Sequence, residues 1–477
     1  MSNPFKRFII YGLLLTASAG CNKYLDTALP AGTISGQNAY VSDNSVSAVV
    51  TTNFISLSNS GLFTGGTGGN VAYLTGLYTD ELQNFGTSAA NNIAFYRNNI
   101  QYGNVGFWSD LYSKIFVVNS TLEGIQKTSA QLYYKNQWLG ETYFIRAFLY
   151  FYLTNLYGDV PLALTSDYAT NNTLHRAPQS QVYQQIVADL KQAQSLLNRG
   201  YTDGFGSSTT HRVRPNRYAA TALLAKTYLY REKWDSAATQ ADSVIAQTSY
   251  SLMPLAQAFA SNNPETIWAF APLTSSAPVE YGYYNNGMPS PIVAPNTTTT
   301  YNVLAVMDSV LVKAFESGDN RFNSWIRAVP VTGSSPAVTY YLPNKYASSA
   351  VNTTNDIVLR TAEIYLIRAE ARAHLNNITG AQADLNAVRT RAGLPNTTAA
   401  DQASLLAAIA RERRVELFTE FANRFLDLKR TKAIDTVMAA FAPLKGSTWS
   451  SFMQLMPIPT NDLIQNPNLT PNPGYQQ

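Results

Sequence analysis

The chain has 477 residues, of which 45% are hydrophobic and 13% are charged, so it encodes a folded protein with a large core and not a disordered one. Its formal net charge is only +4 and no basic tract alternates with aromatic residues, which argues against nucleic acid as a partner. The single cysteine excludes an internal disulfide and a cysteine metal cluster.

The first twenty residues have the pattern of a secretory signal peptide. Lys6 and Arg7 precede an apolar run at 8–15, which is too short to span a membrane, and small residues follow at 17–20. Cys21 comes directly after Ala-Gly and resembles the cysteine of the bacterial lipoprotein box, which is lipidated and becomes the first residue. Several acyl chains would hold such a protein stably to a bilayer. The alternative is an exported soluble protein with a stray thiol.

Four segments follow before the middle of the chain. Residues 41–57 are weakly periodic and predict a first helix. The glycine-rich stretch at 61–70 lacks both GxGxxG order and a Walker lysine, so we interpret it as a loop and not as a phosphate cradle. Residues 95–102 predict a polar, aromatic loop, and residues 108–125 predict a helix with one apolar stripe.

The stretch from 138 to 162 predicts the helix around which the molecule is organised. Its apolar residues recur every three or four positions: Phe144, Ile145, Phe148, Phe151, Tyr152 and Leu156. This apolar arc is too wide for a helix that packs on one side only. Gly158 supplies a C-terminal stop and Pro161 prevents the helix from resuming. We therefore expect a central helix with neighbours on several sides.

Two later segments, 216–243 and 364–388, share a pattern. Each predicts a helix, a short polar turn and a second helix that begins with alanines. Small residues let adjacent helices pack closely, which is the basis of tetratricopeptide pairs. The two copies are divergent and widely separated, so they predict a helical scaffold and not a regular solenoid. Inserts rich in Pro, Asn and Thr interrupt the helices, notably at 285–302 and 330–355.

Sequence blocks run through the whole chain in a fixed order. CNKYLDT begins at the lipidation cysteine, and RAFLYFYLTNLYGDVPL covers the end of the central helix. NPETIWAF, LRTAEIYLIRAEARA, LNAVRTRAGLP, ERRVELFTEFANRFLDLKRT and LMPIPTNDLIQNPNLTPNPGY follow. Together they resemble the SusD/RagB family of outer-membrane nutrient-binding lipoproteins. At Ala422-Asn423 the chain departs from the Gly-His that related sequences often carry, which we expect to adjust a helix end and not the fold.

The resemblance implies a mainly α fold, in which about eight helices form four tetratricopeptide-like pairs with long loop-rich inserts and little strand. It implies a cell-surface lipoprotein, anchored in the outer membrane and facing the exterior, that binds oligosaccharides and delivers them to a SusC-like TonB-dependent transporter. Such proteins are not enzymes, and the resemblance implies no cofactor. Some members bind peptides instead, and a helical scaffold that binds only protein partners remains the second alternative.

The same blocks suggest how the chain is divided. We predict a signal peptide at 1–20, an N-terminal region with the central helices at 21–260 and a C-terminal region at 261–477. The C-terminal region contains the loop-rich insert 272–355 and the closing helices.

The densest cluster of charge surrounds Glu416 and Glu420, two carboxylates one helical turn apart. Paired carboxylates can perform acid–base chemistry. However, Arg413 precedes Glu416 by three residues and Arg424 follows Glu420 by four, and these spacings predict ion pairs along one helix face. The histidines lie far apart without HExxH spacing and no G-x-S-x-G motif occurs, so neither a zinc site nor a serine hydrolase is supported. A catalytic pair assembled from distant loops stays open.

Sugar binding requires flat apolar faces and planar hydrogen-bonding groups, which are best presented on loops. The chain is rich in tyrosine, with 30 residues, and several lie in predicted loops. The candidate ligand-binding residues are Asp80, Glu81, Tyr96, Tyr102, Trp108, Tyr281, Tyr283, Tyr284, Asn285, Asn286, Trp325, Arg327 and Tyr341. Trp108 fits the core of a helix equally well.

The run YGYYNN at 281–286 is the most specific of these candidates. Three tyrosines and two amides stand before an insert without apolar periodicity, so we expect Tyr281, Tyr283 and Tyr284 to be exposed and to stack on sugar rings. The competing interpretation is a covered strand whose rings pack on the scaffold.

Overall fold

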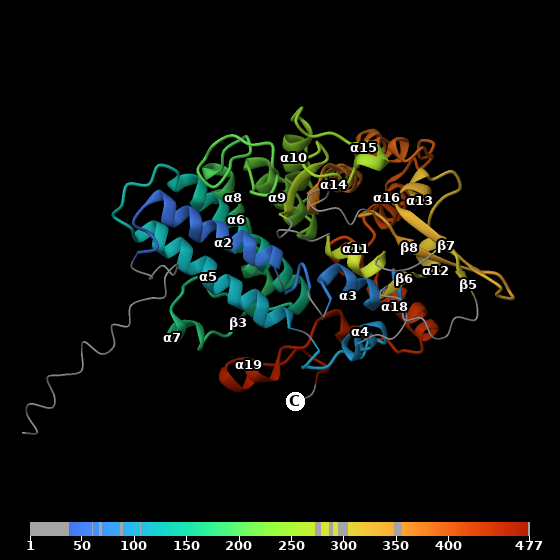
Figure 1. Cartoon of the computed structure of the whole chain (residues 1–477), viewed down its shortest axis with the longest axis horizontal. Helices are drawn as coiled ribbons and strands as arrows, with labels where there is room; N and C mark the ends of the chain where they lie inside the picture. Colours follow the sequence, from blue (N-terminus) through green and yellow to red (C-terminus); the bar gives the residue numbers. More distant parts are fainter. Residues whose placement is uncertain are drawn as a thin grey trace, which may run out of the picture.

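The computed structural model describes residues 38–59, 61–65, 69–85, 89–104, 106–271, 278–285, 290–293, 304–347 and 355–475. The predicted signal peptide, Cys21 and Asn286 therefore lie outside the described residues. The predicted mainly α fold with little strand is confirmed, because the strands are short and most elements are helices (Figure 1).

The helices are α2 (Asp43–Asn59), α3 (Val71–Tyr78), α4 (Ala90–Tyr96), α5 (Phe107–Lys127), α6 (Lys135–Tyr157), α7 (Tyr168–Asn171), α8 (Gln179–Leu196), α9 (Arg217–Tyr230), α10 (Trp234–Ile245), α11 (Val279–Tyr284), α12 (Ser309–Val312), α13 (Asn320–Ser324), α14 (Thr361–His374), α15 (Ile378–Arg391), α16 (Gln402–Glu416), α17 (Asn423–Arg430), α18 (Ile434–Phe441) and α19 (Thr460–Gln465). The strands are β1 (Leu82–Asn84), β2 (Val160–Pro161), β3 (Arg176–Ala177), β4 (Thr266–Phe270), β5 (Ile292–Val293), β6 (Ala305–Met307), β7 (Ile326–Thr332), β8 (Val338–Pro343) and β9 (Asp356–Arg360).

Helix α6 is the predicted central helix. It packs between α5 and α8, and almost all of its residues from Phe144 to its end are buried. Phe148 contacts the rings of Phe63 and Trp268, with centroid distances of 4.7 and 5.0 Å. The helix ends at Gly158, whose φ of +77° is a conformation that glycine adopts without strain. The expectation of neighbours on several sides is confirmed.

The two predicted repeats are the helix pairs α9–α10 and α14–α15. In each pair a three-residue turn with one positive φ reverses the chain, at Glu232 and at Asn376. Helix α10 packs on α14, so the pairs join into one array that continues from α6 and α8 to α15 and α16. Trp234 of α10 stacks on His374 of α14, at 3.8 Å between ring centroids. The tetratricopeptide-like scaffold is therefore confirmed.

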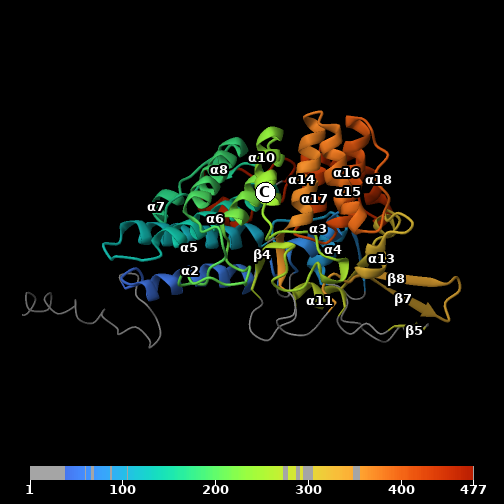
Figure 2. The ribbon, with the colours of Figure 1, turned by 90° about the horizontal axis from the view of Figure 1, so that it is seen from above.

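The inserted segments form a second layer. Figure 2 shows α8, α10, α14 and α16 along one side of the molecule and α2, α11 and strands β5, β7 and β8 along the other. The described strands make small sheets: β1–β6, β2–β3, β4–β9 and the three-stranded β5–β7–β8, with β7 and β8 antiparallel. Several of the predicted ligand-binding residues lie in this layer, on α11, β7 and β8.

The glycine-rich stretch at 61–70 makes space for a neighbouring side chain. Gly65 has a φ of +82°, and a Cβ at this position would overlap the hydroxyl of Tyr283. At the end of the stretch Asn70 caps α3 by accepting a hydrogen bond from the backbone N–H of Tyr73, at 2.8 Å. Among the described residues of this stretch, the glycines thus serve packing and a turn.

Two predicted segments differ from the structure. The aromatic loop expected at 95–102 begins in the last turn of α4. The charged block around Glu416 is not one helix, because α16 ends at Glu416 and the chain takes positive φ values at Thr419, Phe421 and Ala422 before α17 begins. Ala422 has a φ of +63°, in the left-handed region that glycine favours, so the departure from Gly-His does fall at a helix end.

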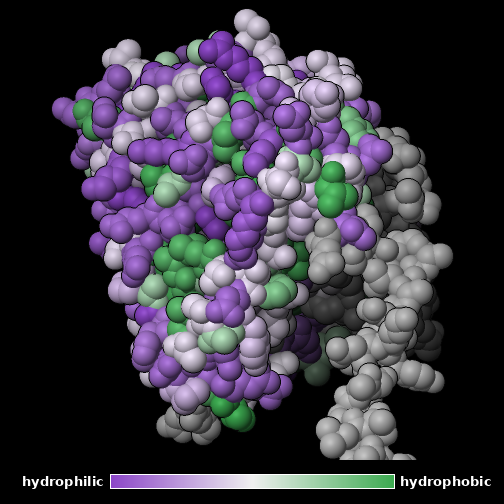
Figure 3. Space-filling view, turned by 90° about the vertical axis from the view of Figure 1, so that its left-hand side faces the viewer, coloured by the Kyte–Doolittle hydropathy of each residue, from purple (hydrophilic) through white to green (hydrophobic). Residues whose placement is uncertain are grey.

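No described helix combines the length and the apolar character that a membrane crossing requires. The end of the molecule that carries α2, α5 and α8 is largely hydrophilic, with one compact hydrophobic area near the middle of the view (Figure 3).

Candidate ligand-binding surface

Asp80 and Glu81 follow α3 but do not face solvent. Asp80 is 2% exposed and accepts hydrogen bonds from Arg414 and Arg424, at 2.7–2.8 Å. Burial would raise the pKa of Asp80, but the hydrogen bond from Arg424 and the charges of both arginines outweigh burial and lower it. Burial, and to a lesser extent the charge of Asp80, raises the pKa of Glu81 to about 7. The predicted exposure of these two carboxylates to a ligand is wrong.

The carboxylates of Glu416 and Glu420 are also buried, and their partners differ from those predicted. Glu416 pairs with Arg321 at 2.8 Å and with Arg360 at 2.5 Å, and Glu420 pairs with Arg360 at 2.7 Å. Arg413, which lies on the same helix as Glu416, pairs instead with Asp427. Arg424 lies beyond the break that follows Glu416 and pairs with Asp80. The prediction of structural ion pairs is confirmed, but the prediction that these pairs form between neighbours along one helix face is wrong.

The two candidate tryptophans belong to the core. Trp108 is 2% exposed and packs edge-on against Tyr157, at 5.0 Å between ring centroids. Trp325 is also 2% exposed, and its indole N–H donates to the carbonyl of Leu255 at 2.9 Å. Lys345 lies over the Trp325 ring at 5.1 Å from its centroid. Both rings are therefore covered by protein, so neither presents a free face for a sugar.

Residues 281–284 belong to a short helix, α11, with one half-buried and one buried side, and Asn285 follows it. Tyr283 and Tyr284 are 6% and 2% exposed, so the prediction that they are exposed is wrong. The ring of Tyr283 stacks on Tyr73 of α3, at 4.7 Å and 16°. Asn285 is buried as well and donates to the carbonyl of Pro343 at 3.1 Å. Tyr281 is half-buried and remains accessible.

Tyr102 and Tyr341 are half-buried at separate places. Tyr102 contacts the ring of Tyr475 near the C-terminus, at 6.2 Å. Tyr341 contacts Phe322 at 5.5 Å. In the β7–β8 ladder Tyr341 pairs with Ala328, which places it on the face opposite to that of its neighbour Tyr340.

The other face of the β7–β8 ladder carries the half-buried Arg327 and Tyr340 beside Val329 and Leu342, which are fully buried. Arg327 and Val329 lie on this face, opposite Leu342 and Tyr340. Arg327 is half-buried; burial lowers its pKa and the nearby Tyr281 hydroxyl partly restores it. The register of the hairpin thus places Arg327 and Tyr340 on one surface, beside Tyr281 of α11.

Strand β1 extends this surface. Phe85 contacts the ring of Tyr340 edge-on, at 4.9 Å and 73°. Gln83 is exposed on the same side of β1, two residues earlier, and hydrogen-bonds with Tyr96 of α4. We call this surface the aromatic strip. It consists of Gln83, Phe85, Tyr96, Tyr281, Arg327 and Tyr340.

The aromatic strip offers what a glycan needs. Partly exposed rings can lie against the CH faces of sugar rings, and the Gln83 amide and Arg327 guanidinium can hydrogen-bond with hydroxyls. Three of its members, Tyr96, Tyr281 and Arg327, are predicted candidates that the fold brings to one surface. The candidate set lacked Gln83, Phe85 and Tyr340. The signal that could have found Gln83 and Phe85 is their i, i+2 spacing beside the apolar Leu82.

Two family models match the chain. A model described as starch-binding and associating with the outer membrane matches residues 52–229, and a model described as the SusD family matches residues 332–475. Among curated proteins, the chain is similar to the SusD-like protein P2 of Formosa agariphila, with 26% identity over 98% of this chain and 99% of the relative. It is also similar to the SusD-like protein P25 of the same organism, with 24% identity over 99% of both chains.

Solved structures match over nearly the whole chain. A laminarin-binding SusD-like protein is 25% identical and superposes with a TM-score of 0.75 over 91% of this chain and all of the other. Surface glycan-binding protein A from Bacteroides uniformis superposes with a TM-score of 0.74 over 90% of this chain and 99% of the other, at 19% identity. At that identity the second likeness shows the shared fold alone.

Proposed function

Because this chain belongs to the SusD/RagB family, we propose that it binds oligosaccharides at the outer-membrane surface and delivers them to a SusC-like TonB-dependent transporter. The observation that carries the proposal is the likeness, over nearly the whole chain, to a protein that binds laminarin. The description of the family model over residues 52–229, as starch-binding and associating with the outer membrane, supports both the ligand class and the location.

We propose the aromatic strip as the ligand-contacting surface. Phe85 and Tyr340 supply the stacking faces, while Gln83 and Arg327 supply directional hydrogen bonds. The protein acts by binding and not by catalysis in this proposal. The carboxylate pair of the charged block, Glu416 and Glu420, is buried and paired with cations, so it is not positioned to meet a sugar.

The test is a binding assay of the chain from residue 22 onward with laminarin and starch as probes. Tyr340→Ala and Arg327→Gln should each weaken binding to the better glycan by tenfold or more, about 1.4 kcal/mol, at an unchanged melting temperature. Tyr133→Ala is the matched control, because Tyr133 is 89% exposed and is not part of the strip. Failure to bind any polysaccharide, including a wider neutral and acidic panel, would refute the proposed function. An equal loss in the control would refute the site.

The lipid anchor is tested separately. In the proposal the acylated Cys21 holds the protein to the membrane, so Cys21→Ala should abolish acylation and release the protein from the membrane fraction. The experiment is performed in cells that lack the transporter, because a bound transporter would retain the unlipidated protein. A variant that still fractionates with the outer membrane in such cells would show that Cys21 is not the anchor.

A further inference from the structure

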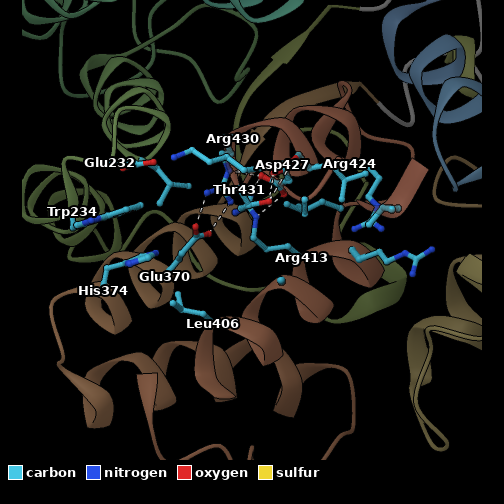
Figure 4. A pocket seen from close by; sticks show the side chains of 18 of the residues that line it. Glu232, Trp234, Glu370, His374, Leu406, Arg413, Arg424, Asp427, Arg430 and Thr431 are labelled. Atoms are coloured by element: carbon cyan, nitrogen blue, oxygen red, sulfur yellow. Dashed lines mark hydrogen bonds and ion pairs between the residues drawn. The ribbon is translucent and has the colours of Figure 1, made fainter. Parts of the chain in front are cut away.

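A cavity of about 680 Å³ lies among α10, α14, α16 and α17, and no residue of the aromatic strip lines it (Figure 4). This volume is in the range of pockets that hold small organic ligands. The proposed glycan-binding function makes no use of it. The cavity combines two kinds of wall, one apolar and one lined with arginines, and each restricts the molecule that could occupy it.

The apolar wall comes from four helices and the loops between them. Its residues are Leu229, Leu406, Ala410, Leu417, Leu428, Ala433 and Val437. The stacked, half-exposed rings of Trp234 and His374 also line the cavity and lie side by side in Figure 4. A ligand that fills this space therefore needs an apolar or ring-shaped body, because bare water against such a wall is unfavourable.

The opposite part of the lining contains Arg413, Arg414 and Arg424. Arg414 and Arg424 share one carboxylate, that of Asp80. Arg413 pairs through Nε and Nη2 with Asp427. Two guanidinium groups against one carboxylate leave an excess of positive charge at this end of the cavity. The adjacent Glu81 offsets it only in part near neutral pH, because burial raises its pKa to about 7.

Some of these guanidinium donors have no acceptor. The Arg413 side chain is 2% exposed, yet its Nη1 donates to no described residue, and the same holds for the buried Nε of Arg414. A buried donor without an acceptor destabilises a protein, and more so when it is charged. Arg414 and Arg424 keep 16% and 14% of their side chains accessible and both line the cavity. The two unpaired nitrogens are themselves covered by protein, so an anion in the cavity would meet the partly accessible guanidinium groups of Arg414 and Arg424.

The lining also decides which anion fits. Glu232, Glu370 and Asp427 lie around the same space and offset the charges of Arg430 and Lys432, which also line it, so the extra charge of a dianion such as phosphate gains little there. A carboxylate matches the planar fork of a guanidinium group and can be attached to an apolar body. We propose that this cavity binds a small monocarboxylate whose carboxylate pairs with Arg414 and Arg424 and whose apolar body lies against Trp234 and the leucine-lined wall.

Calorimetric titration of the chain from residue 22 onward tests the proposal. The probes are benzoate, cyclohexanecarboxylate and glucuronate, with benzyl alcohol as a neutral analogue and inorganic phosphate as a dianion. At least one apolar carboxylate should bind with one-to-one stoichiometry, and at least tenfold more tightly than benzyl alcohol, phosphate or the polar glucuronate. If none of the carboxylates binds, or if phosphate binds as tightly as they do, the proposal is refuted.

Variants locate the binding. Ala410 is exposed at the edge of the cavity, so Ala410→Phe should block entry and abolish binding without disturbing the core. Ala407→Phe is the matched control, because Ala407 is exposed on the same helix and does not line the cavity. Arg414→Gln should weaken carboxylate binding at least tenfold and leave benzyl alcohol unaffected, while Arg424 still neutralises Asp80. Carboxylate binding that survives Ala410→Phe would refute the site, and glycan binding should be unchanged in all three variants.

Discussion

Helices α6 and α11 both carry closely spaced aromatic residues, and both bury most of them, yet the causes of burial differ. Helix α6 has 23 residues and neighbours from α5 and α8, so its own periodicity already requires a surrounding core. Helix α11 has six residues, less than two turns, and shows no period. Its Tyr283 is buried because Tyr73, about two hundred residues earlier, stacks on it. Aromatic density alone therefore does not indicate exposure in this protein.

The largest effect is expected in α6. Phe148→Ala should lower the free energy of unfolding by about 3–5 kcal/mol, because it empties a site packed against Phe63 and Trp268. Equilibrium denaturation measures the change. A loss of less than about 1 kcal/mol would contradict the central position of α6.

In α11 two tyrosines on either side of Gly282 should separate effects on stability from effects on binding. Tyr283→Ala should lower the free energy of unfolding by about 3 kcal/mol, since it removes a ring stacked on Tyr73. Tyr281→Ala is the matched variant on the half-exposed side of the same helix, and it should leave stability nearly unchanged while weakening glycan binding. The reverse pattern, with affinity lost at position 283 and stability lost at position 281, would overturn the assignment of the two sides of α11.

A smaller effect is expected for Glu81, another candidate that proved to be buried. Its pKa is about 7 in the folded chain, against an ordinary value of 4.5, so the folded state holds an extra proton between these values. This contribution therefore lowers stability as the pH rises from 5 to 8, by about 2–3 kcal/mol. Glu81→Gln should remove that part of the pH dependence when unfolding is measured at both pH values. Parallel pH profiles for the wild type and the variant would contradict this account.

The parts of the fold that sequence could predict are those determined by neighbours along the chain. The stop of α6 at Gly158 and the turns within α9–α10 and α14–α15 depend on residues a few positions apart. The ion pairs depend on residues far apart instead. Glu416 finds Arg321 and Arg360, at separations of 95 and 56 residues, while the arginine three positions before it pairs elsewhere.

The candidate surface was predictable only in part, because β-strand register determines it. Tyr340 and Tyr341 are indistinguishable by composition, but they lie on opposite faces once β8 pairs with β7. Strand β1 is three residues long, so the alternation that exposes Gln83 is too short to be a convincing signal by itself. Which tyrosines are accessible thus depends on pairing across the sheet.

The C-terminal end of α3 is stabilised by residues from far along the chain, Lys445 and the two arginines that pair with Asp80. The Lys445 ammonium donates to the carbonyls of Leu77, Tyr78 and Thr79 at the end of α3, at 2.8–3.1 Å. The contacts to Lys445 and to Arg414 span 366–368 and 334 residues. Because the chain is synthesised from its N-terminus, α3 cannot gain this cap until about nine tenths of the chain has been made. Contacts between residues far apart in the sequence slow folding, so the α3 region should fold late. It should stay accessible to proteases and chaperones until the C-terminal part of the chain is present.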